Sequence, residues 1–207
     1  MPIFLVQQDF VVLLKGNSMK IIGVTGGTGG GKTTVTNILK SFGACVVDAD
    51  VTAREVVMPG SLALSEIEDM WDVVENGSLN RKALAEIVFN DEAELHKLNS
   101  IVHKYVIDEI KLKLAKCTQE IFVIDAIALF ESGLSDLCDT TVAVIADKSL
   151  RHKRIMARDN LTEQEAWMRI NAQKSDEFYI ENADVVIFNN ESVSNEDMVE
   201  VVKRELM

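Results

Sequence analysis

The chain has 207 residues, of which 47% are hydrophobic, so it is long enough for one well-buried domain with a small insertion. Its 33 acidic and 21 basic residues give a net charge of −12, which argues against nucleic acid or an anionic membrane as a partner of the general surface. The three cysteines lack metal-ligand or redox spacing, which argues against a disulfide framework and indicates reduced thiols in the cytoplasm.

The first eighteen residues contain an apolar run, Phe10–Leu14, that is too short to span a bilayer. No basic start precedes this run, as a secretion signal would require. Met19 stands directly before the first predicted strand, so we expect residues 1–18 to be an N-terminal extension outside the core fold and Met19 to be the functional start. An additional edge strand is the alternative.

A glycine-rich segment, Gly26–Thr34, matches the phosphate-binding pattern G-x-x-x-x-G-K-[ST]. The apolar run at residues 20–24 predicts a buried strand before it, and apolar residues at helical spacing predict a helix from about Lys32. Glycines let successive backbone N–H groups turn around an anion, and the helix N-terminus adds its positive dipole end. We expect Lys32 to reach the β- and γ-phosphates of a nucleotide and the Thr33 hydroxyl to bind magnesium. These flanking elements disfavour a chance glycine-rich turn.

A second strand, predicted over residues 44–50, ends in Asp48 and Asp50. Side chains two apart on a strand point the same way, so both carboxylates would face one space at the carboxyl end of the strand. Open α/β sheets bind their ligands at that edge. One carboxylate could take a hydroxyl proton while the other holds magnesium through water. The alternative is that one of them only caps the next helix, predicted over residues 51–57.

Residues 59–116 show helical patterns almost without a strand, which predicts a helical insertion between the second and third strands. Helices are expected to start at Ser65 and Asp91, each followed by Glu three residues on, and at 79–81. An insertion beside a phosphate site favours acceptor binding, and a purely structural cap is the alternative. His103 lies on or beside the apolar stripe of the last helix, where a hydrogen-bonded core role competes with catalysis.

Three further apolar runs, residues 120–125, 141–146 and 183–189, predict buried strands, and Asn195–Leu206 predicts a closing helix. The alternation of strands and helices predicts an α/β fold of three layers, in which helices cover both faces of a five-stranded parallel sheet. Asp125, at the end of the third strand, has the form of a Walker-B acid that helps hold magnesium. A capping aspartate at the end of a buried strand has the same form.

Basic residues gather between residues 148 and 158 of this acidic chain, with Arg169 further on. Thr162 and Glu165 predict a capping box that begins a helix over residues 163–173. A guanidinium placed at a transferring phosphoryl group stabilises its charge, and a helical pair that closes over a nucleotide excludes water. A solvated charged face is the alternative. The local positive charge favours function for one or two of these arginines.

From Met19 to its end, the chain resembles the dephospho-coenzyme A kinase family, phosphate-loop proteins of the nucleoside monophosphate kinase type. The phosphate loop alone indicates only a superfamily, whereas the further elements in this order are far more specific. The resemblance is carried by Gly23–Thr33, Val47–Arg54, Leu79–Arg81, Val88-Phe89, His103, Leu129–Gly133, Arg154, Arg158-Asp159, Arg169–Gln173, Ala183-Asp184 and Asn189.

The resemblance implies transfer of the γ-phosphoryl group of ATP, with Mg2+, to the ribose 3′-hydroxyl of dephospho-CoA. The products are CoA and ADP, in the last step of coenzyme A biosynthesis. It implies a phosphate-loop core over residues 19–58 and 117–207, a CoA-binding insertion over 59–116 and a helical lid at about 154–178. The expected partner is this small molecule alone, with neither nucleic acid nor membrane, and the chain is expected to be a monomer or a weak homo-oligomer.

The resemblance also assigns roles to single residues. Asp50 is the expected general base, and Asp48 supports magnesium or the base, although the choice between them stays open. Arg158 would stabilise the transferring group and Arg154 would contact ATP. The triphosphate would be held by Gly27, Gly29, Gly30, Gly31, Lys32, Thr33 and Thr34, with Thr33 and Asp48 at magnesium. The acceptor would be met by Arg54, Arg81, His103, Leu129, Phe130 and Glu131.

The chain departs from the family pattern at three positions. Lys104 and Ile127 stand where proline is usual, and Tyr179 stands where lysine is common. Because proline fixes φ, its loss is expected to loosen the acceptor-site loops without removing a catalytic group. Two other functions are the alternatives: a kinase of another small acceptor, such as a nucleoside monophosphate, and a nucleotide-binding regulatory module with little turnover.

Overall fold

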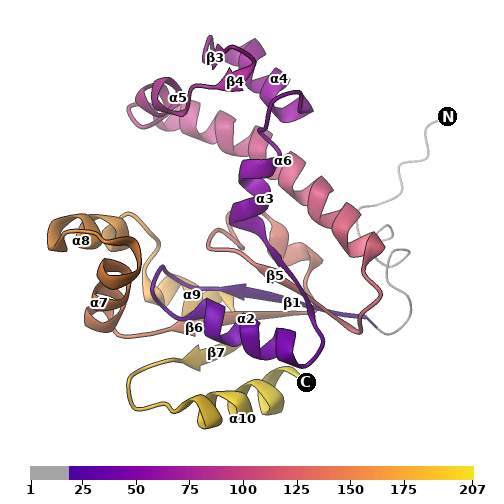
Figure 1. Cartoon of the computed structure of the whole chain (residues 1–207), viewed down its shortest axis with the longest axis vertical. Helices are drawn as coiled ribbons and strands as arrows, with labels where there is room; N and C mark the ends of the chain where they lie inside the picture. Colours follow the sequence, from indigo (N-terminus) through magenta and orange to yellow (C-terminus); the bar gives the residue numbers. More distant parts are fainter. Residues whose placement is uncertain (1–18) are drawn as a thin grey trace. The chain divides into compact units, whose positions relative to one another are not determined.

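The computed structural model describes residues 19–207 of the chain (Figure 1). The expected N-terminal extension, residues 1–18, lies outside the described residues. The described chain forms two compact units, one made of residues 19–47 with 117–207 and the other of residues 48–116. The second unit therefore starts ahead of the predicted insertion boundary at residue 59.

The first unit is built on the five-stranded parallel sheet that the sequence predicts, with the strand order β2-β5-β1-β6-β7. Strand β1 lies between β5 and β6, so the glycine-rich segment that follows β1 leaves the middle of the sheet. The strands are β1 Lys20–Thr25, β2 Cys45–Asp48, β5 Ile121–Asp125, β6 Thr140–Ile145 and β7 Val185–Phe188.

Helices cover both faces of this sheet, which accounts for the unbroken apolar runs of its strands (Figure 1). Successive side chains of a strand point to opposite faces. Val142 and Val144 of β6 belong to the core formed with α2 and α10, whereas Ala143 and Ile145 pack with Tyr179 of α9. The predicted three-layer arrangement is confirmed within this unit. These helices are α2 Lys32–Ser41, α9 Asp176–Asn182 and α10 Asn195–Leu206.

The rest of the first unit consists of a 3-10 helix, Leu134–Leu137, and the helices α7, Lys148–Asp159, and α8, Glu163–Asn171. Helix α7 is followed by its C-cap residue, Asn160, whose φ of 53° is left-handed, a conformation that asparagine tolerates better than most residues. The predicted capping box is confirmed, because the Thr162 hydroxyl accepts from the Glu165 N–H and the Glu165 carboxylate accepts from the Thr162 N–H.

The second unit is mainly helical and has its own apolar core, which includes Ile67, Trp71 and Ile101. The helix expected from Ser65 begins earlier, because the Ser61 hydroxyl accepts from the Leu64 N–H and caps it. The two short strands were not predicted, since two residues are too few to show a period. The elements are α3 Ala49–Glu55, α4 Leu62–Met70, β3 Val74–Glu75, β4 Ser78–Leu79, α5 Arg81–Val88 and α6 Glu92–Lys116.

Lys104 lies inside the unbroken helix α6, contrary to the expectation of a looser segment where the family has proline. Its ammonium group donates to the Glu66 carboxylate of α4 over 3.1 Å, and the Tyr105 hydroxyl donates to the same oxygen over 2.8 Å. The hydrogen bonds from Tyr105 and Lys104 hold the pKa of Glu66 below its ordinary value. Lys104 therefore helps to join α4 to α6.

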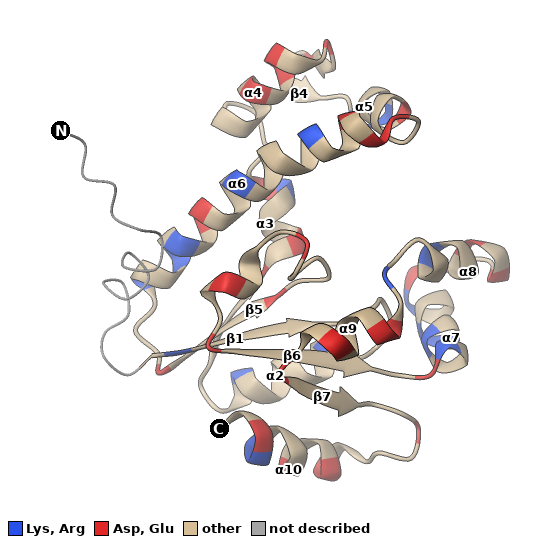
Figure 2. Cartoon of the chain, turned by 180° about the vertical axis from the view of Figure 1, so that it is seen from behind, with Lys and Arg blue, Asp and Glu red and all other residues tan. Residues whose placement is uncertain are grey.

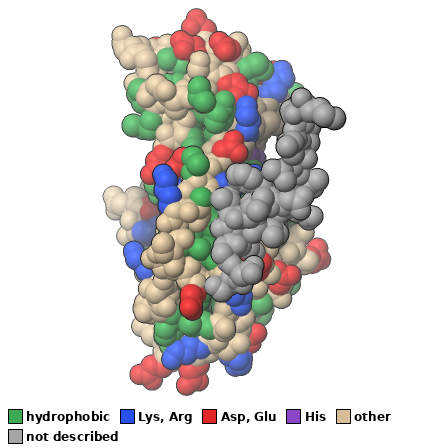
Figure 3. Space-filling view, turned by 90° about the vertical axis from the view of Figure 1, so that its right-hand side faces the viewer, with side chains coloured by type: hydrophobic (Ala, Val, Ile, Leu, Met, Phe, Trp, Pro, Cys, Tyr) green, Lys and Arg blue, Asp and Glu red, His purple; other side chains and the backbone are tan. Residues whose placement is uncertain are grey.

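The surface of the described residues carries charges of both signs. On the face that Figure 3 shows, acidic, basic and hydrophobic side chains are interspersed over the part of the chain that the structure describes. None of the helices within residues 19–207 combines the length and the apolar character that crossing a membrane requires.

Asp184, just before β7, ties that strand to β6. One of its carboxylate oxygens accepts from the Thr141 hydroxyl over 2.7 Å and from the Thr141 N–H over 2.8 Å. These bonds hold the pKa of Asp184 below its ordinary value. The ionised carboxylate therefore stabilises the fold above its unfolded-state pKa, about 3.9, and this contribution is lost as the pH falls through the lowered folded-state value.

We expect Asp184→Asn to lower the free energy of unfolding at pH 7 by about 0.5–1 kcal/mol, since the exposed site is screened by solvent. The difference from the unaltered chain should shrink below about pH 4, where the carboxylate of the unfolded state becomes protonated while the native one is still ionised. Urea unfolding at pH 7, 5 and 3.5 measures this, with the exposed Glu181→Gln as control. A difference that stays constant over this range contradicts the assignment.

Candidate active site

The glycine-rich loop joins β1 to α2 and has room for no larger residue at its end. Gly31 is the N-cap of α2 and has a φ of 103°, in the left-handed region that side chains rarely adopt. A Cβ added at Gly31 would lie 1.7 Å from Nδ2 of Asn189, inside the contact distance of the two atoms. Gly31 is therefore required both by its backbone conformation and by the approach of Asn189.

Side chains outside the loop hold its carbonyl groups. Nη1 of Arg154 donates to the Gly29 carbonyl over 3.2 Å, and Nδ2 of Asn189 donates to the Gly30 carbonyl over 3.1 Å. Arg154 also donates to the Asn189 carbonyl over 3.1 Å, which links the two. A peptide group is planar and trans, so the N–H of Gly31 points away from Asn189. A series of N–H groups turned to one side in this way forms an anion-binding nest.

The first turn of α2 is suited to an anion. It contains no acidic residue, and within the described chain no side chain caps its N-terminus. The positive end of the helix dipole is thus not neutralised by a carboxylate of its own. The Lys32 ammonium folds back and donates to the Gly26 carbonyl over 2.9 Å, while Thr33 is exposed. The predicted phosphate ligands from Gly27 to Thr34 are consecutive in this loop and turn.

Helix α7, which carries basic residues (Figure 2), brings a second predicted arginine, Arg158, to the loop. Nη2 of Arg158 lies 3.3 Å from the Thr28 hydroxyl, and the same guanidinium pairs with Asp159 through bonds of 2.7 and 2.8 Å. Asp159 raises the pKa of Arg158, and Arg158 lowers that of Asp159. Arg169 contacts the same carboxylate. Arg154 and Arg158, spaced one helical turn apart, both contact the loop.

Asp125 closes β5 beside the start of the loop, because it is the register partner of Val24 in β1. The strand end is tied to β1 as well, since the Ala126 N–H donates to the Val24 carbonyl and the Thr25 hydroxyl donates to the Ile127 carbonyl. The segment at Ile127 is therefore anchored without the proline that the family usually has. Asp125 thus lies at the position that its interpretation as a Walker-B acid predicts.

Two of the predicted acceptor residues, Leu129 and Phe130, pack against other parts of the first unit. Leu129 is fully buried, and a Cβ added at Gly23 of β1 would lie 2.8 Å from its Cδ2 atom. Phe130 packs its ring edge-on against Phe178, with ring centroids 6.0 Å apart. The Leu129 side chain has no exposed surface in this structure and supports β1, so its contact with a substrate stays a prediction. Glu131 is exposed.

Asp48 and Asp50 do not share a strand face, which corrects the sequence prediction. Strand β2 ends at Asp48, and Oδ1 of Asp48 accepts from the Val51 N–H over 2.9 Å as the N-cap of α3. Asp48 therefore caps α3, and whether it also supports magnesium or the base stays a prediction. Asp50 lies in the first turn of α3, so strand alternation does not extend to it, and both carboxylates are exposed.

Helix α3 is fixed on α6 within the second unit. The buried Thr52 hydroxyl donates to the Asp48 carbonyl over 2.9 Å, and Nζ of Lys113 donates to that hydroxyl and to Glu55 over 3.2 and 2.8 Å. The other predicted residues of this unit are placed on three helices. Arg54 and Arg81 are exposed on α3 and α5, and His103 is half-buried on α6.

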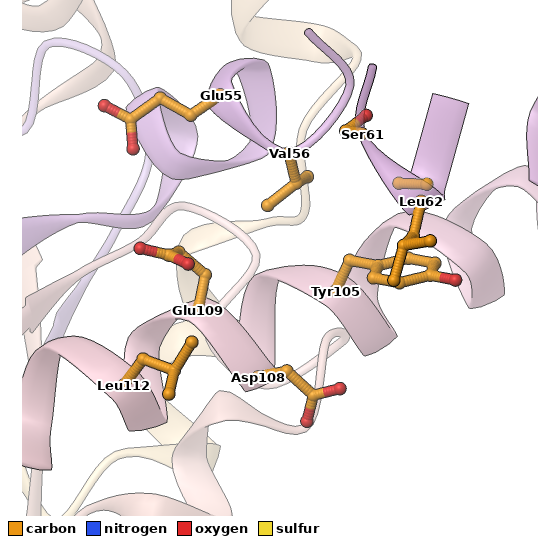
Figure 4. Close-up of a pocket in the computed structure, with 9 residues that line it drawn as sticks. Glu55, Val56, Ser61, Leu62, Tyr105, Asp108, Glu109 and Leu112 are labelled. Atoms are coloured by element: carbon orange, nitrogen blue, oxygen red, sulfur yellow. The ribbon is translucent and has the colours of Figure 1, made fainter. Parts of the chain in front are cut away.

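A pocket of about 530 Å³ opens between α3, α4 and α6 of the second unit, with Val56 and Leu112 directed into it (Figure 4). None of the predicted site residues lines it. His103 lies about 160° around α6 from Tyr105, so it faces away from the pocket. The lining is apolar with acidic groups: Glu55, Val56, Ser61, Leu62, Ala63, Tyr105, Asp108, Glu109 and Leu112.

Comparison with known proteins decides between the phosphate-loop families. The family model for dephospho-CoA kinase matches residues 20–195. The chain belongs to the dephospho-CoA kinase family. The dephospho-CoA kinase of Fusobacterium nucleatum is 38% identical over 189 residues, which cover 90% of this chain and 97% of that protein.

Solved structures agree with membership of the dephospho-CoA kinase family. A crystal structure from Thermus thermophilus superposes with a TM-score of 0.79 at 31% identity, covering 92% of this chain and 100% of that one. The dephospho-CoA kinase from Campylobacter jejuni gives a TM-score of 0.63 at 26% identity, over 89% of this chain and 96% of that one.

Sequence reasoning gave no role to Asn189, although it carries part of the resemblance to the dephospho-CoA kinase family. Its amide holds the Gly30 carbonyl, and its backbone N–H donates to the Ile145 carbonyl over 2.7 Å. The signal that could have found it is its place directly after the last predicted strand, because the carboxyl ends of parallel strands meet at the ligand-binding edge of the sheet.

Proposed function

We propose that the chain transfers the γ-phosphoryl group of ATP to the ribose 3′-hydroxyl of dephospho-CoA, giving CoA and ADP. The observation that carries this proposal is the match of residues 20–195 to the dephospho-CoA kinase family. The glycine-rich loop supports it, because Arg154 and Asn189 hold the Gly29 and Gly30 carbonyls from outside and the Gly31 N–H is turned to the other side.

The triphosphate is assigned to the loop residues from Gly27 to Thr34, with the Lys32 ammonium at the β- and γ-phosphates. Arg158 is assigned to the transferring group, where a guanidinium offsets the charge that develops. Arg154 serves the nucleotide by holding the Gly29 carbonyl, and we propose that it also contacts ATP. The structure supports both arginine assignments by their contacts with the loop.

Magnesium is assigned to oxygen donors, which fit this cation. Thr33 supplies an exposed hydroxyl and Asp48 a carboxylate, of which Oδ1 caps α3 and Oδ2 remains as a second acceptor for a magnesium-bound water. Magnesium in phosphate sites uses one or two carboxylates with phosphates and water, rather than a cage of protein ligands. Bound there, it would neutralise charge on the β- and γ-phosphates.

The acceptor is assigned to the helical unit, residues 48–116. Asp50 takes the proton of the 3′-hydroxyl, and its helix is fixed by Lys113. The exposed guanidinium groups of Arg54 and Arg81 suit the phosphates of dephospho-CoA, with His103 and Glu131 as further contacts. The acidic pocket between α3 and α6 suits a neutral, apolar group and disfavours phosphate.

We also propose a cytoplasmic location. Cys45, Cys117 and Cys138 are all among the described residues, and none of the three forms a disulfide there. Reduced cysteines are the rule in cytosolic proteins. Burial raises the pKa of the Cys45 thiol, and the neighbouring Cys117 adds to this effect. A thiol with a raised pKa is a poor nucleophile at neutral pH, which makes a cysteine-dependent reaction a weaker candidate than phosphoryl transfer.

An acceptor panel tests the proposal. ADP release is measured with ATP and magnesium in the presence of dephospho-CoA, CoA, several nucleoside monophosphates or no acceptor, and the product is identified by mass. We expect turnover with dephospho-CoA alone and a product with the mass of CoA. Turnover with a nucleoside monophosphate instead would show that the chain is a kinase of a different acceptor. ATP binding without any turnover would favour a regulatory module.

A further inference from the structure

Arg151 is the one Lys, Arg, Asp or Glu residue that is buried among residues 19–207, with 2% of its surface exposed. It lies in the first turns of α7, one helical turn before Arg154. A buried charge is costly unless it is paired and hydrogen-bonded. The guanidinium of Arg151 must therefore be compensated by the groups that it contacts.

The guanidinium of Arg151 and the side-chain amide of Gln173 together bind both backbone groups of Thr28. Nε of Arg151 donates to the Thr28 carbonyl over 2.9 Å, and the Thr28 N–H donates to Oε1 of Gln173 over 2.8 Å. Nη2 of Arg151 lies 3.4 Å from that Oε1, and Nη1 pairs with Asp176 in the first turn of α9 over 2.5 Å. The Arg151 side chain thus connects α7, the loop and α9.

These contacts determine which way two peptide groups of the loop face. Because the peptide is planar and trans, the N–H of Gly29 points away from Arg151, opposite the Thr28 carbonyl. The Gly27 carbonyl likewise points away from Gln173, and it accepts from the Gly30 N–H over 3.1 Å. Arg151 and Gln173 therefore orient the first half of the loop, as Arg154 and Asn189 orient the second half.

The fit between loop and guanidinium is close. A Cβ added at Gly27 would lie 2.0 Å from Nη2 of Arg151, and one added at Gly29 would lie 2.8 Å from the Arg151 carbonyl. The loop thus rests directly on this residue of α7. A shorter or neutral side chain at position 151 would leave the Thr28 carbonyl without its donor.

We propose that Arg151 is a positioning residue for the phosphates of ATP, which acts by holding Thr28 so that the loop is set for anion binding before the nucleotide arrives. Preorganised donors need no rearrangement when the ligand binds, so their loss appears first in nucleotide affinity. The inference rests on the proposed binding of ATP by the loop and is independent of the acceptor.

The test compares Arg151→Lys with Arg204→Lys, the same change at an exposed arginine of α10. Lysine keeps the charge for Asp176 but lacks the planar fork that also reaches Thr28. We expect the Kd for ADP, measured by calorimetry, and the KM for ATP to rise about tenfold in Arg151→Lys, the loss of one charge-assisted hydrogen bond. The KM for dephospho-CoA should stay within about twofold, and Arg204→Lys should match the unaltered chain.

Gln173→Met gives a second variant, which removes the acceptor of the Thr28 N–H without disturbing the Arg151–Asp176 ion pair. The same rise in the ADP Kd, with an unchanged urea midpoint, supports the proposal even where Arg151→Lys fails to fold. An unchanged ADP Kd in folded Arg151→Lys and Gln173→Met overturns it. ADP binding does not involve the acceptor, so the two proposals can fail separately. If the ADP Kd rises in these variants but the unaltered chain shows no turnover with dephospho-CoA, the proposed substrate is wrong and the role of Arg151 is still supported.

Discussion

Replacing Lys32 by alanine is expected to lower kcat by about a thousandfold or more. The Lys32 ammonium is carried by the first turn of α2 and already reaches back over the loop to the Gly26 carbonyl. In the transition state the charge of the transferring group spreads onto its oxygens, and the variant would lack the cation that meets it. Steady-state ADP release with saturating ATP, magnesium and dephospho-CoA measures the loss.

Lys40→Ala is the matched control for this variant. Lys40 is an exposed lysine in the last turn of the same helix, so its removal tests the loss of a lysine from α2 without touching the loop. It is expected to leave kcat within about twofold of the unaltered chain. A Lys32→Ala protein that kept more than a tenth of the native kcat would contradict the assignment of Lys32 to the phosphates.

Asp50→Asn is expected to lower kcat by about a hundred- to ten-thousandfold, the range that a positioned general base supplies. Asparagine is nearly the same size as aspartate but cannot accept the hydroxyl proton. The Kd for ATP should change by no more than about twofold, because the residues assigned to ATP lie in the loop, α2 and α7. Single-turnover kinetics with bound ATP separates the chemical step from binding.

Asp48→Asn is the comparison that decides between the two carboxylates. Asp48 caps α3, and asparagine is as good an N-cap as aspartate, so this variant keeps the helix while it removes the charge. We expect a smaller loss of kcat than in Asp50→Asn, together with a higher magnesium requirement. A larger loss in Asp48→Asn would reverse the assignment and make Asp48 the base.

The sheet and the phosphate loop could be predicted because local sequence decides them. Parallel strands covered on both faces must be apolar throughout, and β1, β5 and β6 are such runs. The loop needs glycine where φ is positive, as at Gly31, and a lysine at the start of the helix. These requirements fall within a few neighbouring residues, so a pattern can show them.

The errors arose where a contact outside the pattern decided the outcome. Asp50 was expected on a strand face, but the Asp48 cap starts α3 immediately and puts Asp50 on a helix. Ser65 was expected to cap a helix that Ser61 already caps. The burial of Leu129 against Gly23 could not be predicted either, because it depends on a residue more than a hundred positions away.

The prediction of functional arginines in α7 was limited in the same way, because contacts with distant residues decide their roles. The basic pattern indicated that one or two of these residues are functional, and the family resemblance assigned the roles to Arg154 and Arg158. Burial separates Arg151 from the others, and burial depends on the distant residues Gln173 and Asp176. The spacing of residues 151, 154 and 158 predicts one helix face, but it does not tell which member of that face is enclosed by the loop.

The contact between Gly27 and Arg151 links two positions in the history of the chain. Gly27 occupies a place that the phosphate-loop pattern leaves open, and what excludes a side chain there is the guanidinium, 2.0 Å from where a Cβ would stand. A lineage that shortened residue 151 would free position 27 to vary, and a lineage that gained a side chain at 27 would need a smaller partner on α7. Residues 27 and 151 are therefore expected to covary among related chains. The residue that restricts the loop would then be one that follows it by more than a hundred positions in the sequence.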